Sequence, residues 1–230
     1  MKTLGIIGGL GPESTLDYYQ RIIALYRERM RDGHYPEFII VSVDLRTGLD
    51  FMDAGDLGGM ADFLLDGIRK LARAGAEFGI ISANTPHIVF DEVAPRSPIP
   101  LISIVEATCE AAKALGLKRV GLLGTRFTMQ GRFFPDVFVR EGMSLVVPTQ
   151  DEQAYIHDKY MSELVNGIFL AETRERLLKI VERLEEREDI EGVILGGTEL
   201  PLLLRDATLH DVPFLDTTQI HVRSAVAQML

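Results

Sequence analysis

Gly192-Val-Ile-Leu-Gly-Gly-Thr-Glu-Leu200 carries the clearest indication of the fold in this sequence. Its apolar residues 193–195, with Ile190 just before them, predict a short buried strand. Two glycines, a hydroxyl and a carboxylate follow, so polar groups are expected at the carboxyl end of this strand. In open α/β sheets that edge is where ligands bind. A second stretch, Phe78-Gly-Ile-Ile-Ser-Ala-Asn-Thr-Pro-His87, repeats the order of apolar strand, small residues, threonine and helix start.

The rest of the chain alternates strands and helices in two similar halves, which predicts parallel sheets with right-handed crossovers. We therefore expect an α/β fold of two pseudo-symmetric half-domains, each a mainly parallel sheet flanked by helices, with the active-site cleft between them. Residues 1–102 plus 216–230 are expected to form the first half-domain and residues 103–215 the second. Matching residues recur in the two halves. Gly5 and Gly8 correspond to Gly121 and Gly124 at one constant offset, and Thr85 and Pro100 correspond to Thr198 and Pro213 at a second constant offset.

Three local expectations complete this picture. Residues 44–56 are predicted to form a polar loop, residues 99–102 a fourth strand of the first half, and residues 127–140 one helix.

Composition narrows the possible partners. The 230 residues include 24 Lys and Arg against 34 Asp and Glu, a formal charge of −10, without a basic block. This argues against nucleic acid, which requires a positive footprint. The single cysteine, Cys109, excludes an intrachain disulfide and a cysteine-based metal site, and we expect no metal. Because no signal peptide and no apolar run of ~20 residues are recognisable, we expect a cytoplasmic protein without a membrane partner.

Two titratable residues are candidates for catalysis. His87, beside a strand end, is of the type that serves as a general base near neutral pH, although a hydrogen-bonded histidine at a helix start without a catalytic role is the simpler interpretation. Glu199 lies where the cleft is expected, although acidic residues are also common in first helical turns. Cys109 is interpreted as a packed small residue.

Other residues are candidates for holding a ligand. Gly8-Gly-Leu-Gly-Pro12 precedes a helix, so the N–H groups of Gly9 and Gly11 would suit a carboxylate or phosphate, or form only a tight turn. It is a poor dinucleotide fingerprint, because Ser14 stands at the third glycine position. Thr125 and Thr128 occupy the matching turn of the second half. Arg46 is a candidate fork for a carboxylate, or a solvated surface residue.

Four motifs together resemble the aspartate/glutamate racemase family and cover nearly the whole chain. The resemblance implies racemisation of acidic amino acids without a cofactor, frequent homodimers, and two cysteines that face each other across the substrate. It also implies that the protein binds a small amino acid or dicarboxylate. The motifs are Leu4-Gly-Ile-Ile-Gly-Gly-Leu-Gly-Pro-Glu-Ser-Thr15, Asn84-Thr-Pro-His87, Leu123-Gly-Thr125 and Gly196-Gly-Thr-Glu199.

The sequence departs from this family at the two cysteine positions, where Ala83 and Gly197 stand. Neither side chain transfers a proton. Three hypotheses follow: a racemase that uses other groups, with His87 and Glu199 as candidates in opposite halves; a non-catalytic binder of amino acids or dicarboxylates; or a lyase or decarboxylase in which Gly197 leaves space for a larger substrate or a water. The positions that match ligand-contacting residues of the family are Arg46, Asn84, Thr85, Thr125, Thr198 and Glu199.

Overall fold

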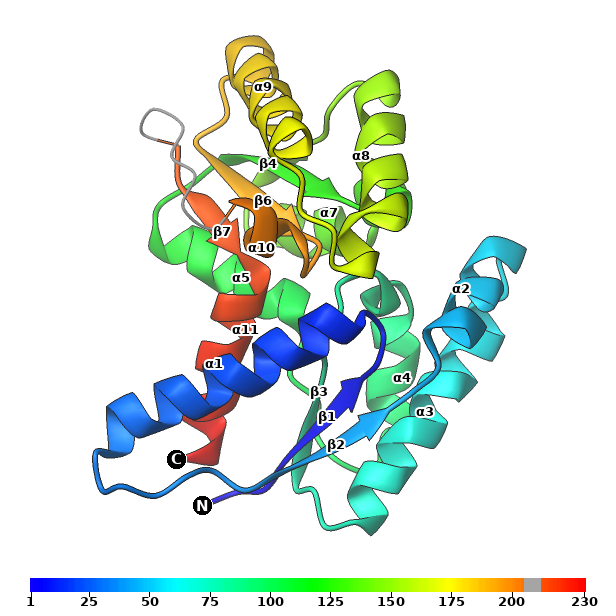
Figure 1. The fold of residues 1–230 in the computed structure, drawn as a ribbon, viewed down its shortest axis with the longest axis vertical. Coiled ribbons are helices and arrows are strands. Elements are labelled where there is room, and N and C mark those ends of the chain that lie inside the picture. Colours follow the sequence, from blue (N-terminus) through cyan, green and yellow to red (C-terminus); the bar gives the residue numbers. More distant parts are fainter. Residues whose placement is uncertain (205–211) are drawn as a thin grey trace. The chain divides into compact units, whose positions relative to one another are not determined.

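The first sheet has the strand order β2-β1-β3 and is parallel throughout. Its strands are β2 (Phe38–Ser42), β1 (Leu4–Gly8) and β3 (Phe78–Ile81). The central strand β1 and its neighbour β3 are completely buried, which explains their unbroken apolar sequences. These strands belong to a computed structural model that describes residues 1–204 and 212–230 (Figure 1).

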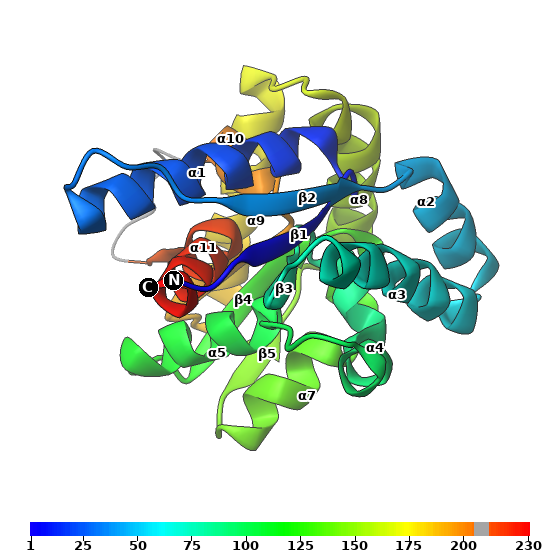
Figure 2. The ribbon, with the colours of Figure 1, turned by 90° about the horizontal axis from the view of Figure 1, so that it is seen from below.

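Helices cover both faces of this sheet. Helices α1 (Pro12–Met30) and α11 (Thr217–Met229) lie on one face, and α3 (Leu57–Arg73) lies on the other (Figure 2). Gly67 of α3 allows this helix to approach Ile7 of β1 closely. The core on the α1 and α11 side consists of large apolar side chains from both helices and from β1 and β3: Leu4, Ile6, Tyr18, Ile22, Tyr26, Phe78, Ile80, Val222, Ala225, Val226 and Met229.

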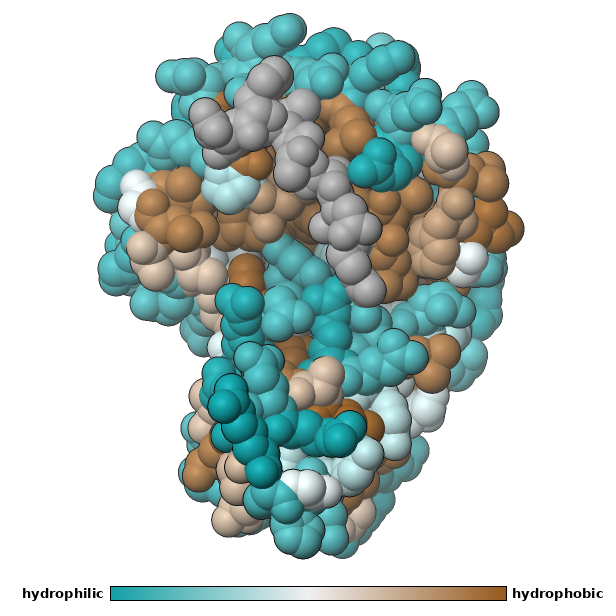
Figure 3. Space-filling view, turned by 60° about the vertical axis from the view of Figure 1, so that its left-hand side comes forward, coloured by the Kyte–Doolittle hydropathy of each residue, from teal (hydrophilic) through white to brown (hydrophobic). Residues whose placement is uncertain are grey.

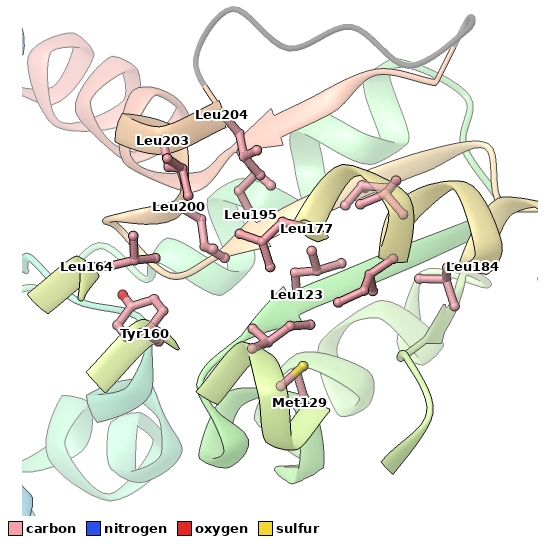
Figure 4. Packing of buried hydrophobic residues seen from close by; sticks show 14 of the residues in the cluster. Leu123, Met129, Tyr160, Leu164, Leu177, Leu184, Leu195, Leu200, Leu203 and Leu204 are labelled. Carbon is pink, nitrogen blue, oxygen red and sulfur yellow. The ribbon is translucent and has the colours of Figure 1, made fainter. Parts of the chain in front are cut away.

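The second sheet has the order β5-β4-β6-β7 and is also parallel. Its strands are β5 (Ser144–Val146), β4 (Arg119–Gly124), β6 (Gly192–Gly196) and β7 (Phe214–Asp216). A leucine-rich cluster joins one face to three helices (Figure 4). These are α8 (Gln150–Ser162), α9 (Ala171–Glu188) and α10 (Leu200–Leu204), while α5 (Ile104–Ala114) and α7 (Phe133–Arg140) lie on the opposite face.

The two sheets repeat one topology, because β1 and β4 are the central strands and β3 and β6 are their matching neighbours. The chain forms two compact units, Met1–Ile104 with Thr218–Leu230, and Val105–Thr217. The α/β class and the parallel sheets flanked by helices are confirmed. The half-domain boundaries predicted from the sequence, residues 1–102 plus 216–230 and residues 103–215, stay a prediction.

The structure corrects three local expectations. Residues 99–102 form no strand and contribute a single bridge between Gly79 and Leu101, in a segment where Pro100 has no N–H to donate. The predicted loop at 44–56 contains α2 (Leu45–Ala54), which begins because the Asp44 carboxylate accepts the N–H groups of Arg46 and Thr47. The predicted helix at 127–140 is interrupted after α6 (Arg126–Gln130) and resumes as α7.

Three short elements complete the described chain. They are the 3-10 helices η1 (Thr85–Val89) and η2 (Leu164–Asn166) and the helix α4 (Phe90–Arg96).

Candidate functional site

The carboxyl end of β3 is tied to the neighbouring strand and helix by serine hydroxyls. Ser82 Oγ donates to the carbonyl of Ile7 at 2.9 Å, and Ser14 Oγ of α1 donates to the carbonyl of Ser82 at 2.7 Å. Ala83 and Asn84 follow, both buried, and η1 starts at once. Two sequence-predicted ligand residues, Asn84 and the partly buried Thr85, therefore lie on a rigid strand end.

His87 is held by the main chain at both ring nitrogens. Nδ1 lies 2.9 Å from the Ala83 carbonyl, and Nε2 accepts the N–H of Ile104 at 3.2 Å. These partners select the neutral tautomer with the proton on Nδ1. Burial, and next the charge of His221, lower the pKa of His87 from its ordinary 6.5 to about 3. Such an imidazole is well suited to positioning the strand end and poorly suited to accepting a proton, so its catalytic role stays only a hypothesis.

His221 of α11 is a buried titratable residue that the motifs did not reveal. Its Nδ1 lies 2.8 Å from the Tyr18 hydroxyl and its Nε2 lies 3.0 Å from the carbonyl of Ile102. Its ring lies edge-on to that of His87, with ring centroids 6.2 Å apart. Burial lowers the pKa of His221 to about 4. The first unit thus contains two adjacent neutral imidazoles.

The glycine turn after β1 has the backbone that its sequence requires. Gly9 has a φ of 84° and Gly11 a φ of 135°, both in the region that favours glycine. The N–H of Gly9 donates to Thr15 Oγ1 at 2.9 Å, so this N–H is engaged within the turn. This bond favours the structural interpretation for Gly9, while ligand binding at the start of α1 stays a prediction.

Arg46 lies in the first turn of α2, after β2. Its guanidinium pairs with Asp50 at 2.7 Å, and its side chain is 75% exposed. A surface ion pair of this kind contributes little to stability. The exposed position agrees with the interpretation of a solvated arginine, and its role as a carboxylate fork stays a prediction.

In the second unit, two threonines occupy the turn after β4. Thr125 caps α6, since its Oγ1 accepts the N–H of Thr128 at 3.3 Å, and the two hydroxyls are also 3.3 Å apart. Both side chains are buried. A Cβ at Gly124 would meet Thr128 and the carbonyl of Gly196, so Thr128 lies against the ends of β4 and β6.

The end of β6 carries a buried carboxylate with two hydroxyl donors. Thr198 Oγ1 donates to Glu199 Oε2 at 3.0 Å, and the hydroxyl of Tyr160, from α8, donates to the same oxygen. Thr198 and Glu199 are at most 2% exposed. Burial, followed by the charge of Glu199, raises the pKa of Tyr160 well above its ordinary value. The phenol therefore holds its proton and shares it with the carboxylate.

Gly197 is a contact point for the ring of Tyr160. A Cβ built on this glycine would lie 2.8 Å from the Tyr160 hydroxyl and 2.9 Å from Cζ, and closer still to Cε2. The expectation that Gly197 leaves space for a larger substrate or a water is therefore wrong, because the aromatic ring occupies that space. Sequence reasoning missed Tyr160, since 39 residues separate it from Glu199 and no local pattern relates them.

The single cysteine and the metal-ligating side chain types add no further candidate site among the described residues. Cys109 of α5 is buried with its Sγ 4.0 Å from the carbonyl of Val137, and burial together with Glu141 and Glu110 raises the pKa of its thiol to about 11. Within residues 1–204 and 212–230, no cluster of three or more histidine, cysteine, aspartate or glutamate side chains is placed to hold a metal ion. No helix in these same two ranges is long and apolar enough to cross a membrane.

Apolar side chains also reach the surface. Figure 3 shows hydrophobic residues on one face among hydrophilic ones. Exposed examples are Leu16 and Tyr19 of α1 and the run 168–170 before α9. The homodimer implied by the resemblance stays a prediction.

Comparisons with known proteins bear on the origin of this arrangement. The broad specificity amino-acid racemase RacX of Bacillus subtilis is 25% identical over 231 residues, which cover 99% of this chain and 98% of that protein. The structure of an aspartate racemase homologue from Pyrococcus horikoshii is 36% identical with a TM-score of 0.85, covering 100% and 99% of the two chains. The aspartate racemase of Picrophilus torridus, at 19% identity and a TM-score of 0.78 over 100% and 94%, shares the fold.

A family model supplies the remaining comparison. The model for Asp/Glu/hydantoin racemases matches residues 7–225, nearly the whole chain, and includes the ends of β3, β4 and β6 described above. The chain belongs to the Asp/Glu/hydantoin racemase family.

Proposed function

We propose that the protein binds aspartate, glutamate or a related small dicarboxylate without a cofactor, and that it acts on the Cα–H bond with groups other than thiols. The observation that carries this proposal is the buried carboxylate of Glu199 at the end of β6, with hydroxyl partners and no thiol beside it. The similarity to a broad specificity amino-acid racemase and to an aspartate racemase homologue supports the class of substrate.

Binding is assigned to groups that donate to carboxylates. Hydroxyl, amide and backbone N–H donors recognise an anionic oxygen more strongly than a neutral one. Donors of this kind lie at the ends of neighbouring strands in each unit. That one ligand contacts both units is part of the proposal and stays a prediction. The proposed ligand-binding residues are Gly9, Gly11, Arg46, Asn84, Thr85, Thr125, Thr128 and Thr198.

The two strand ends differ in their capacity for proton transfer. Racemisation requires an acid or base on each face of Cα. In the second unit, the candidate group is the carboxylate of Glu199, whose Oε2 accepts from Tyr160 and Thr198. In the first unit, Ala83 has no transferable proton and both nitrogens of His87 are bonded to the main chain. We therefore propose that proton exchange on one face is much faster than inversion.

Proton NMR in heavy water tests this function. Purified protein is incubated with L- and D-aspartate and L- and D-glutamate, and the Cα–H signal is followed while chiral chromatography measures inversion. We expect the Cα–H signal of one enantiomer to disappear faster than the other enantiomer forms. Persistence of every Cα–H signal, together with no ligand effect on the melting temperature, would overturn the proposal.

A second function is favoured by the same first-unit geometry. In this alternative, His87 only positions the strand end, neither Ala83 nor Gly197 transfers a proton, and the protein binds its ligand without chemistry. A rise in melting temperature with a Cα–H signal that persists would identify this binding protein. A lyase or decarboxylase would instead consume the amino acid. The cytoplasmic location also stays a prediction.

A further inference from the structure

The buried Tyr160 is the residue that the function described above leaves without a role. It lies at one end of the leucine-rich cluster of the second unit, near Leu164 and Leu200 (Figure 4). Its side chain is 5% exposed, yet its hydroxyl leaves the apolar cluster to donate to Glu199. A phenylalanine would fill the same volume at no polar cost, so the hydroxyl calls for an explanation beyond packing.

The ring reaches this position only because residue 197 is glycine. The Cζ and hydroxyl atoms of Tyr160 stand 2.9 and 2.8 Å from the place of a Cβ on Gly197. The phenol is therefore packed directly on the backbone at the carboxyl end of β6, the edge where ligands bind in parallel sheets. The absence of a side chain at Gly197 therefore allows the hydroxyl oxygen of Tyr160 to lie at this edge.

The carboxylate of Glu199 completes a pair that is able to move a proton. Its Oε2 accepts from Tyr160 and, at 3.0 Å, from Thr198. Burial raises the pKa of Tyr160 and keeps its hydroxyl protonated. A protonated phenol is, by itself, a weak base. The Glu199 carboxylate already accepts a hydrogen bond from this phenol. It is therefore placed to take the phenolic proton while the Tyr160 oxygen accepts a proton from the substrate.

We propose that Tyr160 is the proton-transfer residue of the second unit, with Glu199 as its base. The Cα–H bond breaks and its electron pair remains on the substrate, delocalised into the carboxylate group. The substrate proton bonds to Tyr160 Oη while the phenolic proton passes to Glu199 Oε2. The Tyr160 hydroxyl then exchanges its proton with solvent, and the reverse sequence returns a solvent-derived proton to the same face, so that in heavy water a deuteron replaces the substrate proton. This assignment rests on the proposed action of the protein on a Cα–H bond.

Competing groups in the second unit are less suitable. Cys109 of α5 is buried against the carbonyl of Val137 of α7, and its thiol is held in the protonated form. Thr198 is an alcohol, too weakly acidic to serve unaided, and its hydroxyl already donates to Glu199.

Tyr160→Phe tests the assignment, because it removes the hydroxyl and keeps the ring against Gly197. The rate of Cα–H exchange in heavy water and the aspartate-induced rise in melting temperature are measured on the same samples. We expect exchange to slow by roughly 100-fold or more, with the rise in melting temperature retained. Tyr155→Phe is the matched control on the same helix, and it should exchange at the wild-type rate.

The outcomes separate the two proposals. Equal exchange by wild type and Tyr160→Phe overturns the role of Tyr160 and leaves the proposed function standing. Aspartate binding without exchange in the wild type overturns proton transfer by Tyr160 and leaves the binding function. If neither binding nor exchange occurs with any of the four amino-acid enantiomers, both proposals are wrong. Loss of exchange in Tyr155→Phe as well would show that any change on α8 has this effect, and would also overturn the assignment.

Discussion

The strand ends after β3 and β6 derive from the same local pattern and have become chemically different. After β3, a neutral histidine is bonded at both nitrogens to the main chain, next to a small buried alanine. After β6, a carboxylate meets a phenol whose ring lies on a glycine. The backbone and the threonine persist in both places. Two strand ends of the same topology therefore keep the same backbone pattern and threonine while their titratable groups differ.

This contrast has an energetic side. In the first unit, burial lowers the pKa values of His87 and His221. The folded state therefore accommodates both imidazoles in their neutral form, and protonation of either one destabilises the fold. In the second unit, the ring of Tyr160 opposes the addition of a side chain at Gly197. Each feature gives a way to test the comparison by measuring stability alone.

The largest expected effect is loss of stability on mild acidification, caused by the two buried imidazoles. Their folded pKa values, about 3 and about 4, lie below the ordinary 6.5, so the unfolded chain binds more protons as the pH falls below 6.5. Stability is complete above pH 6.5 and declines toward the folded pKa values. At ~1.4 kcal/mol per pH unit, each histidine costs about 2 kcal/mol between pH 7 and pH 5.

Urea unfolding at pH 7 and pH 5, followed by circular dichroism, measures this loss. His221→Gln should reduce the difference between the two pH values by about half of the histidine contribution, roughly 2 kcal/mol. His34→Gln, at an exposed position, is the matched control and should leave it unchanged. A free energy of unfolding that is the same at pH 7 and pH 5 would contradict the neutral, buried pair.

The next effect concerns the glycine of the second unit. The backbone of Gly197 does not have a positive φ, so an added Cβ is opposed by the Tyr160 ring and not by backbone strain. Gly197→Ala should lower the free energy of unfolding by about 1–3 kcal/mol. The penalty should persist with Tyr160→Phe, which keeps the ring, and vanish with Tyr160→Ala, which removes it.

A double-mutant cycle over these variants isolates the interaction between the two positions. Gly58→Ala in α3 is the control, because the space around a Cβ at Gly58 is open apart from Asp56 at 3.8 Å. The same penalty for Gly197→Ala with and without the ring would show that Tyr160 does not crowd this glycine. For the same reason, Gly197→Cys will need a smaller residue at position 160 before a thiol fits at the end of β6.

Much of this arrangement could be predicted from the sequence because it depends on local patterns. Short apolar runs followed by glycine and threonine placed β3 and β6 and the polar residues at their ends. Helix α2 differs from the predicted loop although its signal is local, because an aspartate such as Asp44 is typical of loops as well as of helix N-caps.

Other features depend on contacts that no short pattern contains. Tyr18 meets His221 across 203 residues of sequence, and Tyr160 meets Glu199 across 39. The sequence showed that Gly197 lacks a side chain, but only the packing of α8 shows what fills the space. The absent thiol was therefore visible in the sequence, whereas the phenol that stands beside the same strand end was not.

The weakest effect that we expect compares the two matched threonines, Thr85 and Thr198, at the two strand ends. Thr198→Val keeps the shape and removes a hydroxyl that donates to Glu199 at 3.0 Å. We expect it to weaken aspartate binding by ~1 kcal/mol, roughly five-fold in Kd. Thr85→Val should weaken binding by a similar factor if the first unit also binds the ligand. Titration calorimetry with aspartate measures both constants.

Thr3→Val is the control, because Thr3 precedes β1 at the opposite edge of its sheet. An unchanged Kd for Thr198→Val would remove this residue from the ligand site. A change for Thr198→Val without one for Thr85→Val would mean that the first strand end no longer contacts the ligand. Equal changes would instead show that both units still bind the ligand and that their divergence is confined to proton transfer.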